Sequence, residues 1–178
     1  FSEISNKIYS ANVYIDSYTI AKALDLDSQI VLAGRVTDPG LTLGPCIHEY
    51  GWNKTDYDLL AAGTLAGHII ECGAQCTGGN YTRWKDVPNM DNIGYPIIEM
   101  NNNGHFSIKK AENTGGLINR ETISEQILYE MGNPTNYISP DVCVDFTSFK
   151  LIEKEHNEVK IIDTKGYSPT DTYKVSIS

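Results

Sequence analysis

The sequence lacks any apolar stretch of the length that crosses a membrane. A membrane-spanning helix needs about 20 consecutive apolar residues, and polar or charged residues interrupt every segment here well before that length. The first residues, Phe1-Ser2-Glu3, show neither a secretory signal pattern nor an initiator methionine. We therefore predict no membrane partner, and a chain that is a fragment or a processed product of a longer one.

Basic residues are also scarce. Lys and Arg number 14 against 23 Asp and Glu, so the formal net charge at pH 7 is -9. This balance argues against nucleic acid as the main partner, because nucleic acid binds to basic surfaces. It still permits an anionic small molecule, since one local arginine and a few backbone amides can bind it. With 178 residues, 40% of them hydrophobic, the chain is long enough for one globular domain.

Cysteine is rare, and its spacing fits no metal or redox motif. Cys72 and Cys76 are four residues apart, too far for a C-x-x-C pair, and Cys46 and Cys143 form no second pair with zinc-site spacing. We predict no metal site. An even count allows two disulfides, but apolar neighbours favour free, mostly buried thiols and a reducing compartment, hence a cytoplasmic protein.

The first part of the chain alternates strand and helix patterns. Residues 8–14 are typical of a strand, 17–26 of a helix capped by Ser17, and the apolar run 29–34 of a strand buried on both faces. Strand, helix and strand in this order predict a βαβ unit. The predicted fold class is α/β, a βαβ-type parallel sheet with helices packed on it, followed by a β-rich C-terminal part.

Further helices are expected at about 40–50, after the Asp38-Pro39 start signal, and at about 56–72. The second is so rich in small and apolar residues that we expect it in the middle of the structure. The later elements are a long loop at 73–94, a hairpin with strands 96–101 and 105–111 around Asn103-Gly104, a helix at about 119–131 with Ile123, Ile127 and Leu128 on its core face, and three β-like runs within 143–177.

We therefore expect one domain over residues 1–178. Its predicted parts are an α/β core at 1–72, the long loop at 73–94, and the hairpin, helix and β-rich tail at 95–178.

Arg35 and Asp38 directly follow the apolar run 29–34. Ligand sites in α/β folds collect at the carboxyl ends of strands and at helix ends. Arg35 is a candidate for binding a carboxylate, a phosphate or a thioester-linked anion through its fork of donors. The alternative is a turn in which Arg35 pairs with Asp38 and Asp38 caps the next helix.

His68, Glu71 and Cys72 share one helix face, at spacings of three and four residues. An ionisable side chain in so apolar a helix must find a partner or face a cavity. His68 and Glu71 are therefore the acid–base candidates, with a purely structural role as the alternative. Cys72 is a weaker candidate for a nucleophile, because a helix C-terminus disfavours a thiolate.

Two glycine pairs complete the candidates read from residues. Gly115 and Gly116 follow Thr114 ahead of a predicted helix, so their amides could hold an anion, whereas a plain tight turn is the alternative. Gly78 and Gly79 lie in the long loop, and neither pair belongs to a P-loop or a dinucleotide motif. Asp86, in the same loop, is a candidate for a lid contact or for surface packing.

Several blocks of the chain resemble one family. They are "ANVYIDSYTIAKAL", "VLAGRVTDPGLTLGPCIHEYGW", "LAAGTLAGHIIECGAQCTGG", "KDVPNMDNIGYPIIEM", "NTGGLI" and "EQILYEMGNP". Together they are similar to the acyclic terpene utilisation family (AtuA), from about residue 11 to the C-terminus.

The resemblance implies a bacterial or archaeal cytosolic protein linked to catabolism of acyclic terpenes such as citronellol and geraniol through CoA thioesters. Family members normally carry a longer α/β region ahead of this segment. The family blocks include Arg35, Asp38, His68, Glu71, Cys72, Gln75, Gly78, Gly79, Asp86, Gly115 and Gly116. The resemblance thereby adds Gln75 to the ligand-binding candidates, but it supplies no catalytic assignments.

Two hypotheses follow. In the first, the chain is part of a catabolic enzyme, of lyase or hydrolase type, acting on a branched acyl-CoA or related carboxylate. Arg35 and the turn Thr114–Gly116 would then hold the anion in the same cleft as His68 and Glu71. In the second, it is a non-catalytic subunit or assembly module that binds a metabolite or a partner enzyme.

A double-sided buried strand also needs neighbours, so we expect a missing N-terminal segment or another subunit, and an oligomer, to complete the sheet. The sequence identifies no cofactor.

Overall fold

The computed structural model describes residues 5–154 and 156–178. Its α-helices are α1 (Ser17–Asp25), α2 (Gly40–Tyr50), α3 (Tyr57–Ile70) and α4 (Arg120–Leu128). Its strands are β1 (Ala11–Val13), β2 (Pro96–Met100), β3 (Phe106–Lys110), β4 (Tyr137–Ile138), β5 (Cys143–Asp145), β6 (Lys150–Glu153), β7 (Val159–Ile162), β8 (Lys165–Tyr167) and β9 (Val175–Ile177).

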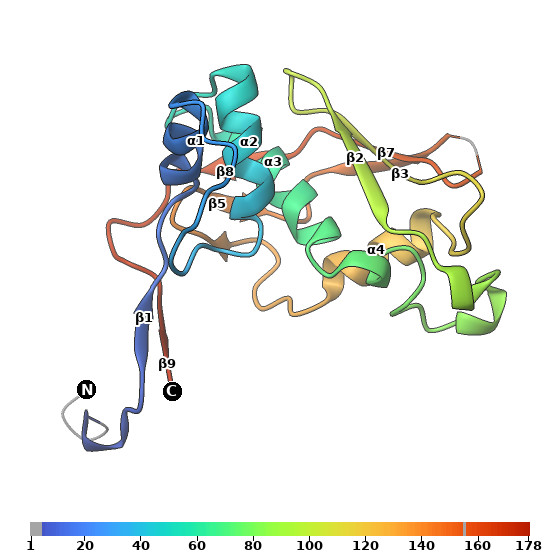
Figure 1. Ribbon diagram of the computed structural model, residues 1–178, viewed down its shortest axis with the longest axis horizontal. Helices are drawn as coiled ribbons and strands as arrows, with labels where there is room; N and C mark the ends of the chain where they lie inside the picture. The colour runs from blue at the N-terminus through green and yellow to red at the C-terminus, as the bar shows by residue number, and fades with distance from the viewer. Residues whose placement is uncertain (1–4, 155) are drawn as a thin grey trace.

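Helix α3 lies at the centre of the molecule, as its composition predicts. Every residue from Leu60 to Ile69 is buried. The helix packs against α2 on one side and against β8, β5, β2 and α4 on the others (Figure 1). Burying a whole helix requires small residues where neighbours come close, and a Cβ at Gly63 would lie 2.6 Å from the Leu43 side chain.

The sheets are antiparallel, so the predicted parallel sheet is wrong. They are the ribbon β1-β9, the four-stranded sheet β2-β3-β7-β6 and the three-stranded sheet β4-β5-β8. Phe106 and Ile108 of β3 and Ile161 of β7 are fully buried in the hydrophobic core. The mixture of helices and sheets is confirmed, but the strands pair antiparallel, both in hairpins such as β2-β3 and between distant segments such as β1 and β9, instead of through βαβ crossovers.

The apolar run 29–34 contains no strand and lies at the surface. Ile30 is 89% exposed and Leu32 is 98% exposed. What remains of the expected βαβ unit is one parallel bridge between Ile15 and Val36, where the Ile15 amide donates to the Arg35 carbonyl at 2.9 Å. Composition indicates a buried strand, but burial depends on neighbouring strands that this segment lacks among the described residues.

Strands β1 and β9 form an arm that projects from the body and carries the two chain ends (Figure 1). The strand expected at 8–14 is thus confirmed only for Ala11–Val13. Ala11 pairs with Ile177 and Val13 with Val175, so these four apolar side chains share one face of the arm. All four are exposed.

The remaining expectations are mostly met. The hairpin β2-β3 forms around Gly104, which has a φ of 78°. In α4, Ile123 and Ile127 are buried as predicted. The prediction that Leu128 lies on the core face is wrong, since its side chain is 67% exposed. The reason is that α4 ends at Leu128, short of the expected residue 131.

Two predicted caps are also wrong. Asp16, not Ser17, caps α1 by accepting from the Thr19 amide at 3.1 Å. Ser17 is instead buried and donates its hydroxyl to Asp141 at 2.7 Å. Asp38 caps nothing in α2, whose N-cap is Pro39.

Candidate functional site

A cavity of about 450 Å³ opens where the chain enters α2 and leaves α3 and α4. Its walls are Asp38, Leu41, Thr42, Ile70, Glu71, Cys72, Tyr129 and Glu130. Leucine, isoleucine and tyrosine side chains supply apolar surface, while three carboxyl groups supply charge. This mixture is typical of a small-molecule site.

The walls of this cavity are brought together by two backbone features. A Cβ at Gly67 of α3 would lie 2.5 Å from the Pro39 Cα, so only glycine lets the start of α2 approach α3 this closely. That approach brings Asp38 to the same cavity as Glu71. Glu130 has a φ of 53°, a left-handed conformation uncommon outside glycine, which turns the chain sharply after α4.

His68 sits behind Glu71. Its Nε2 lies 3.2 Å from the Ile127 carbonyl oxygen, and because a carbonyl can only accept, Nε2 carries the proton. The other ring nitrogen, Nδ1, therefore presents a lone pair to the Glu71 carboxyl, with 3.8 Å to Oε1. The rings of Tyr137 and Phe146 lie 5.9 and 5.5 Å from the imidazole and hold its orientation.

Burial sets the protonation of this pair. The pKa of Glu71 is raised to about 7, mainly by burial and in addition by the Asp38 and Glu130 carboxylates, while Lys174 opposes the shift. Burial lowers the pKa of His68, so the imidazole is neutral at pH 7. The pair thus holds one exchangeable proton near neutrality, on a carboxyl group that lines the cavity.

Buried oxygens without hydrogen-bond partners lie in and behind the walls of this cavity. They include Glu71 Oε2, Gln75 Oε1 and Gln126 Oε1. Gln75 contacts the Tyr129 hydroxyl, and Gln126 contacts Cys72, two of the lining residues. Buried acceptors are normally satisfied, so the oxygen that belongs to a lining residue, Glu71 Oε2, suits a ligand that brings a hydrogen-bond donor.

Of the predicted site residues, Asp38 and Glu71 line this cavity, and His68 and Gln75 lie directly behind lining residues. Arg35 does not line it; its guanidinium carbon lies 5.5 Å from the centre of the Tyr14 ring. Cys72 lines it, but burial and the Glu71 charge raise the pKa of its thiol. That shift disfavours the thiolate, as the helix-end argument predicts.

The glycine pairs lie elsewhere, within the long loop and the segment that packs on it. The Gly115 amide donates to the Asn92 carbonyl at 2.7 Å and the Gly116 amide to the Pro88 carbonyl at 2.8 Å. The Thr114 hydroxyl donates to the Ala111 carbonyl at 2.7 Å. Amides already donated to carbonyls are unavailable to an anion, so the turn 114–116 has the geometry of the structural alternative.

Gly78 and Gly79 serve the same loop. Gly78 has a φ of 113°, and a Cβ on it would lie 2.7 Å from the Val87 side chain; the Gly79 amide donates to the Ala74 carbonyl at 2.9 Å. Asp86 is exposed and pairs with Arg83 at 3.5 Å. The expected single cleft that joins Arg35, His68 and the turn 114–116 is therefore not what the fold builds.

The sequence interpretation missed four residues that shape the site, namely Tyr129, Glu130, Tyr137 and Lys174. The first two lie inside the helix predicted at 119–131, whereas α4 ends at Leu128 and leaves them in the turn that follows it. Tyr137 and Lys174 come from segments 66 and 103 residues beyond Glu71 (137 minus 71 and 174 minus 71). No local spacing rule links such distant residues.

Comparison with known families shows which family the chain belongs to. The family model described as "Acyclic terpene utilisation family protein AtuA" matches residues 1–178, the whole chain. The chain belongs to the AtuA family. This confirms the resemblance of the sequence blocks and links the AtuA chain to acyclic terpene utilisation. No curated protein and no solved structure shows significant similarity to it.

Two further observations bear on the AtuA chain. Within residues 5–154 and 156–178, no three His, Cys, Asp or Glu side chains are grouped so that they could hold a metal ion. In the same residues, the helices are all too short or too polar to cross a membrane. The four cysteines are free, as predicted.

Proposed function

We propose that this AtuA-family chain supplies an acid–base pocket for a catabolic enzyme that acts on the acyl part of a branched CoA thioester. Glu71 is the catalytic proton-transferring group, and His68 is a positioning residue that acts through it. The supporting observation is a carboxyl group that lines a cavity, has a pKa of about 7 and keeps one oxygen without a partner.

The charge of the cavity favours a thioester over a free carboxylate. Asp38, Glu71 and Glu130 all contribute carboxyl groups to the walls, and a carboxylate ligand would meet repulsion from them. A thioester carbonyl is neutral and does not meet this repulsion. Leu41 and Ile70 offer apolar contact to a branched acyl chain.

The reaction we infer is proton transfer at the carbon next to the thioester carbonyl. A group with a pKa near the working pH is well matched to take up and return such a proton. Ionised Glu71 would take the proton from carbon as electrons move onto the carbonyl oxygen, and protonated Glu71 would return it. We also propose a cytoplasmic location, which the free thiols support.

The experiment is deuterium incorporation into citronellyl-CoA, incubated with the full chain in D₂O and followed by mass spectrometry. Glu71→Gln should slow exchange at the α-carbon by roughly 10²-fold or more, the usual contribution of a general base. Glu112→Gln, a change of an exposed loop glutamate, is the matched control and should leave the rate unchanged. Equal rates for wild type and Glu71→Gln would refute the role of Glu71.

The second candidate function, a non-catalytic assembly module, is favoured by the exposed apolar side chains of Ile30 and Leu32. Such a surface suits contact with another subunit or with a further segment of the chain, so this candidate includes the proposal that the protein is an oligomer. Under this candidate the wild-type chain shows no exchange by itself, and association is its activity.

A further inference from the structure

Three side chains form a row at the base of the arm. Ile15 and Val36 pair in parallel, so the preceding residues, Tyr14 and Arg35, share the opposite face. Lys174 lies on the other side of Tyr14 from Arg35, and its carbonyl accepts from the Tyr14 amide at 3.0 Å. The cations flank one ring, with the Arg35 Cζ at 5.5 Å and the Lys174 Nζ at 5.1 Å from its centre.

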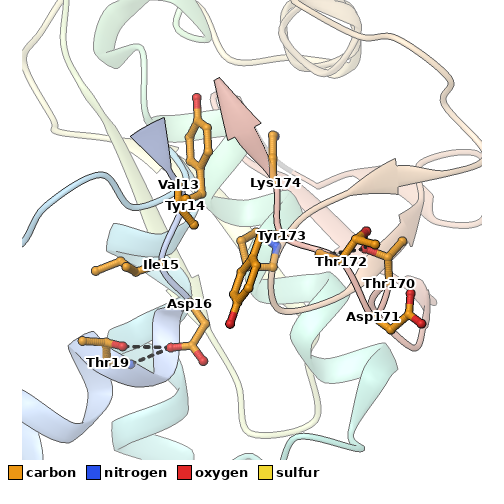
Figure 2. A pocket seen from close by; sticks show the side chains of 11 residues that line it. Val13, Tyr14, Ile15, Asp16, Thr19, Thr170, Asp171, Thr172, Tyr173 and Lys174 are labelled. Carbon is orange, nitrogen blue, oxygen red and sulfur yellow. Dashed lines mark hydrogen bonds between the residues drawn. The ribbon is translucent and has the colours of Figure 1, made fainter. Parts of the chain in front are cut away.

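Tyr14 and Lys174 of the row line a cavity of about 490 Å³ beside the arm, and the Asp16 and Asp171 carboxyl groups also line it. Figure 2 shows that Tyr14 and Tyr173 leave the chain in opposite directions, with the Tyr173 hydroxyl on the side of Asp16. Asp16 accepts from the amide and the hydroxyl of Thr19. The face that carries Tyr14 is therefore turned away from this carboxylate.

Neither cation of the row has a carboxylate within salt-bridge distance among the described residues. Several basic groups elsewhere are paired closely, as between Lys165 and Asp58 at 2.6 Å and between Lys109 and Glu99 at 2.8 Å. Lys174 Nζ donates to the Ile138 carbonyl at 3.5 Å, which leaves its charge without a counter-ion. In a chain of net charge -9, two neighbouring cations without a salt bridge form a local positive site. Two like charges beside one ring are stabilised most directly by an anion.

We infer that Arg35 and Lys174, held by Tyr14, bind the phosphoryl group of a ligand. The guanidinium supplies a planar fork of donors that matches phosphate oxygens, and the ammonium supplies a point charge. Lys174 also lies 5.6 Å from the centre of the Tyr137 ring, which packs on His68. The phosphoryl site is thus adjacent to the Glu71 cavity, but its binding does not depend on the reaction proposed there.

The test measures binding of inorganic pyrophosphate and of coenzyme A to the full chain by isothermal titration calorimetry at fixed ionic strength. Arg35→Gln and Lys174→Gln remove one charge each and keep most of the side-chain stem. Each should weaken binding by roughly ten-fold, the usual loss for one charge-assisted hydrogen bond. Thermal unfolding of both variants should match wild type, since Arg35 is exposed and Lys174 partly exposed.

The matched control is Lys85→Gln. Lys85 also lies over an aromatic ring, 5.6 Å from the centre of Trp84, but on the long loop. It should leave both affinities unchanged. Binding of pyrophosphate and of coenzyme A supports the site, and much tighter binding of coenzyme A indicates further contacts to the nucleotide.

The inference is overturned if neither probe binds, or if Lys85→Gln weakens binding as much as the row variants do. Proton exchange at Glu71 is measured separately. Phosphoryl binding without exchange would therefore refute the reaction and leave this site standing.

Discussion

Glu71 illustrates how neighbours change the chemistry of one residue. Its position on an apolar helix is readable from sequence, but the raised pKa depends on burial and then on the charges of Asp38 and Glu130, which come from other segments. Lys174 opposes them from the C-terminal arm. A carboxyl group with this environment can hold its proton at pH 7, which an exposed glutamate does not.

The pH dependence of stability should report this shift. Glu71 binds its proton more tightly in the folded chain, with a pKa of about 7 against an ordinary value of 4.5. The folded state then binds more protons between these values, so its free energy of unfolding falls as the pH rises from about 5 to 8. Glu71→Gln should remove this loss and be more stable than wild type at pH 8, by up to about 3 kcal/mol.

Urea unfolding at pH 5 and pH 8 measures the difference. His68, whose pKa is lowered, gives a slope of opposite sign, but it is present in wild type and variant alike and cancels to first order. Glu112→Gln should retain the wild-type slope. Parallel pH profiles for wild type and Glu71→Gln would contradict the raised pKa.

At the scale of elements, the contact between α3 and the start of α2 creates the cavity. The Gly67 Cα faces Pro39, with no room for a methyl group between them. Helix propensity alone would favour alanine here by about 1 kcal/mol. A glycine at this position is therefore explained by packing, since it permits the approach that places Asp38 near Glu71.

Gly67→Ala should consequently destabilise the fold. The added methyl meets the Pro39 backbone at 2.5 to 2.6 Å, and overpacking of this kind costs about 1–3 kcal/mol. The matched control is Gly34→Ala, where a Cβ would meet nothing within 4 Å, and its free energy of unfolding should stay within about 0.5 kcal/mol of wild type. Thermal unfolding of both variants measures the two changes in stability. Equal changes for Gly67→Ala and Gly34→Ala would contradict the claim that the close approach of α2 to α3 requires glycine.

At the scale of the whole molecule, the arm and the run 29–34 both expose apolar side chains. Ile30 and Leu32 are almost fully exposed, and Val13, Val175 and Ile177 of the arm are each more than 40% exposed. A two-stranded ribbon is only marginally stable in water. These features suit a surface that another polypeptide covers.

The double substitution Ile30→Ser with Leu32→Ser tests this surface. Burying an isoleucine and a leucine contributes about 1.5–3 kcal/mol each, so wild type should associate with increasing concentration and the double variant should do so much less. Sedimentation velocity over a concentration series measures the association. Leu128→Ser, at an exposed leucine at the end of α4, is the control, and a wild type that stays monomeric throughout would contradict the prediction.

The sequence by itself determined the local elements. The apolar spacing and the Gly51 stop define α2, the buried composition defines α3, and Asn103-Gly104 defines the hairpin turn. It also supplied the family and the pairing of His68 with Glu71, because a spacing of three residues places both on one helix face. These features depend on contacts within a few residues along the chain.

Tertiary structure alone decided the sheet and the composition of the site. The run 29–34 has a strand's composition, but whether it pairs depends on strands elsewhere. Asp38, Glu71, Glu130 and Lys174 come from four segments, and their mutual charges exist only once α2, α3, α4 and the arm have packed. Charge and burial act through space, so distance along the chain could not reveal them.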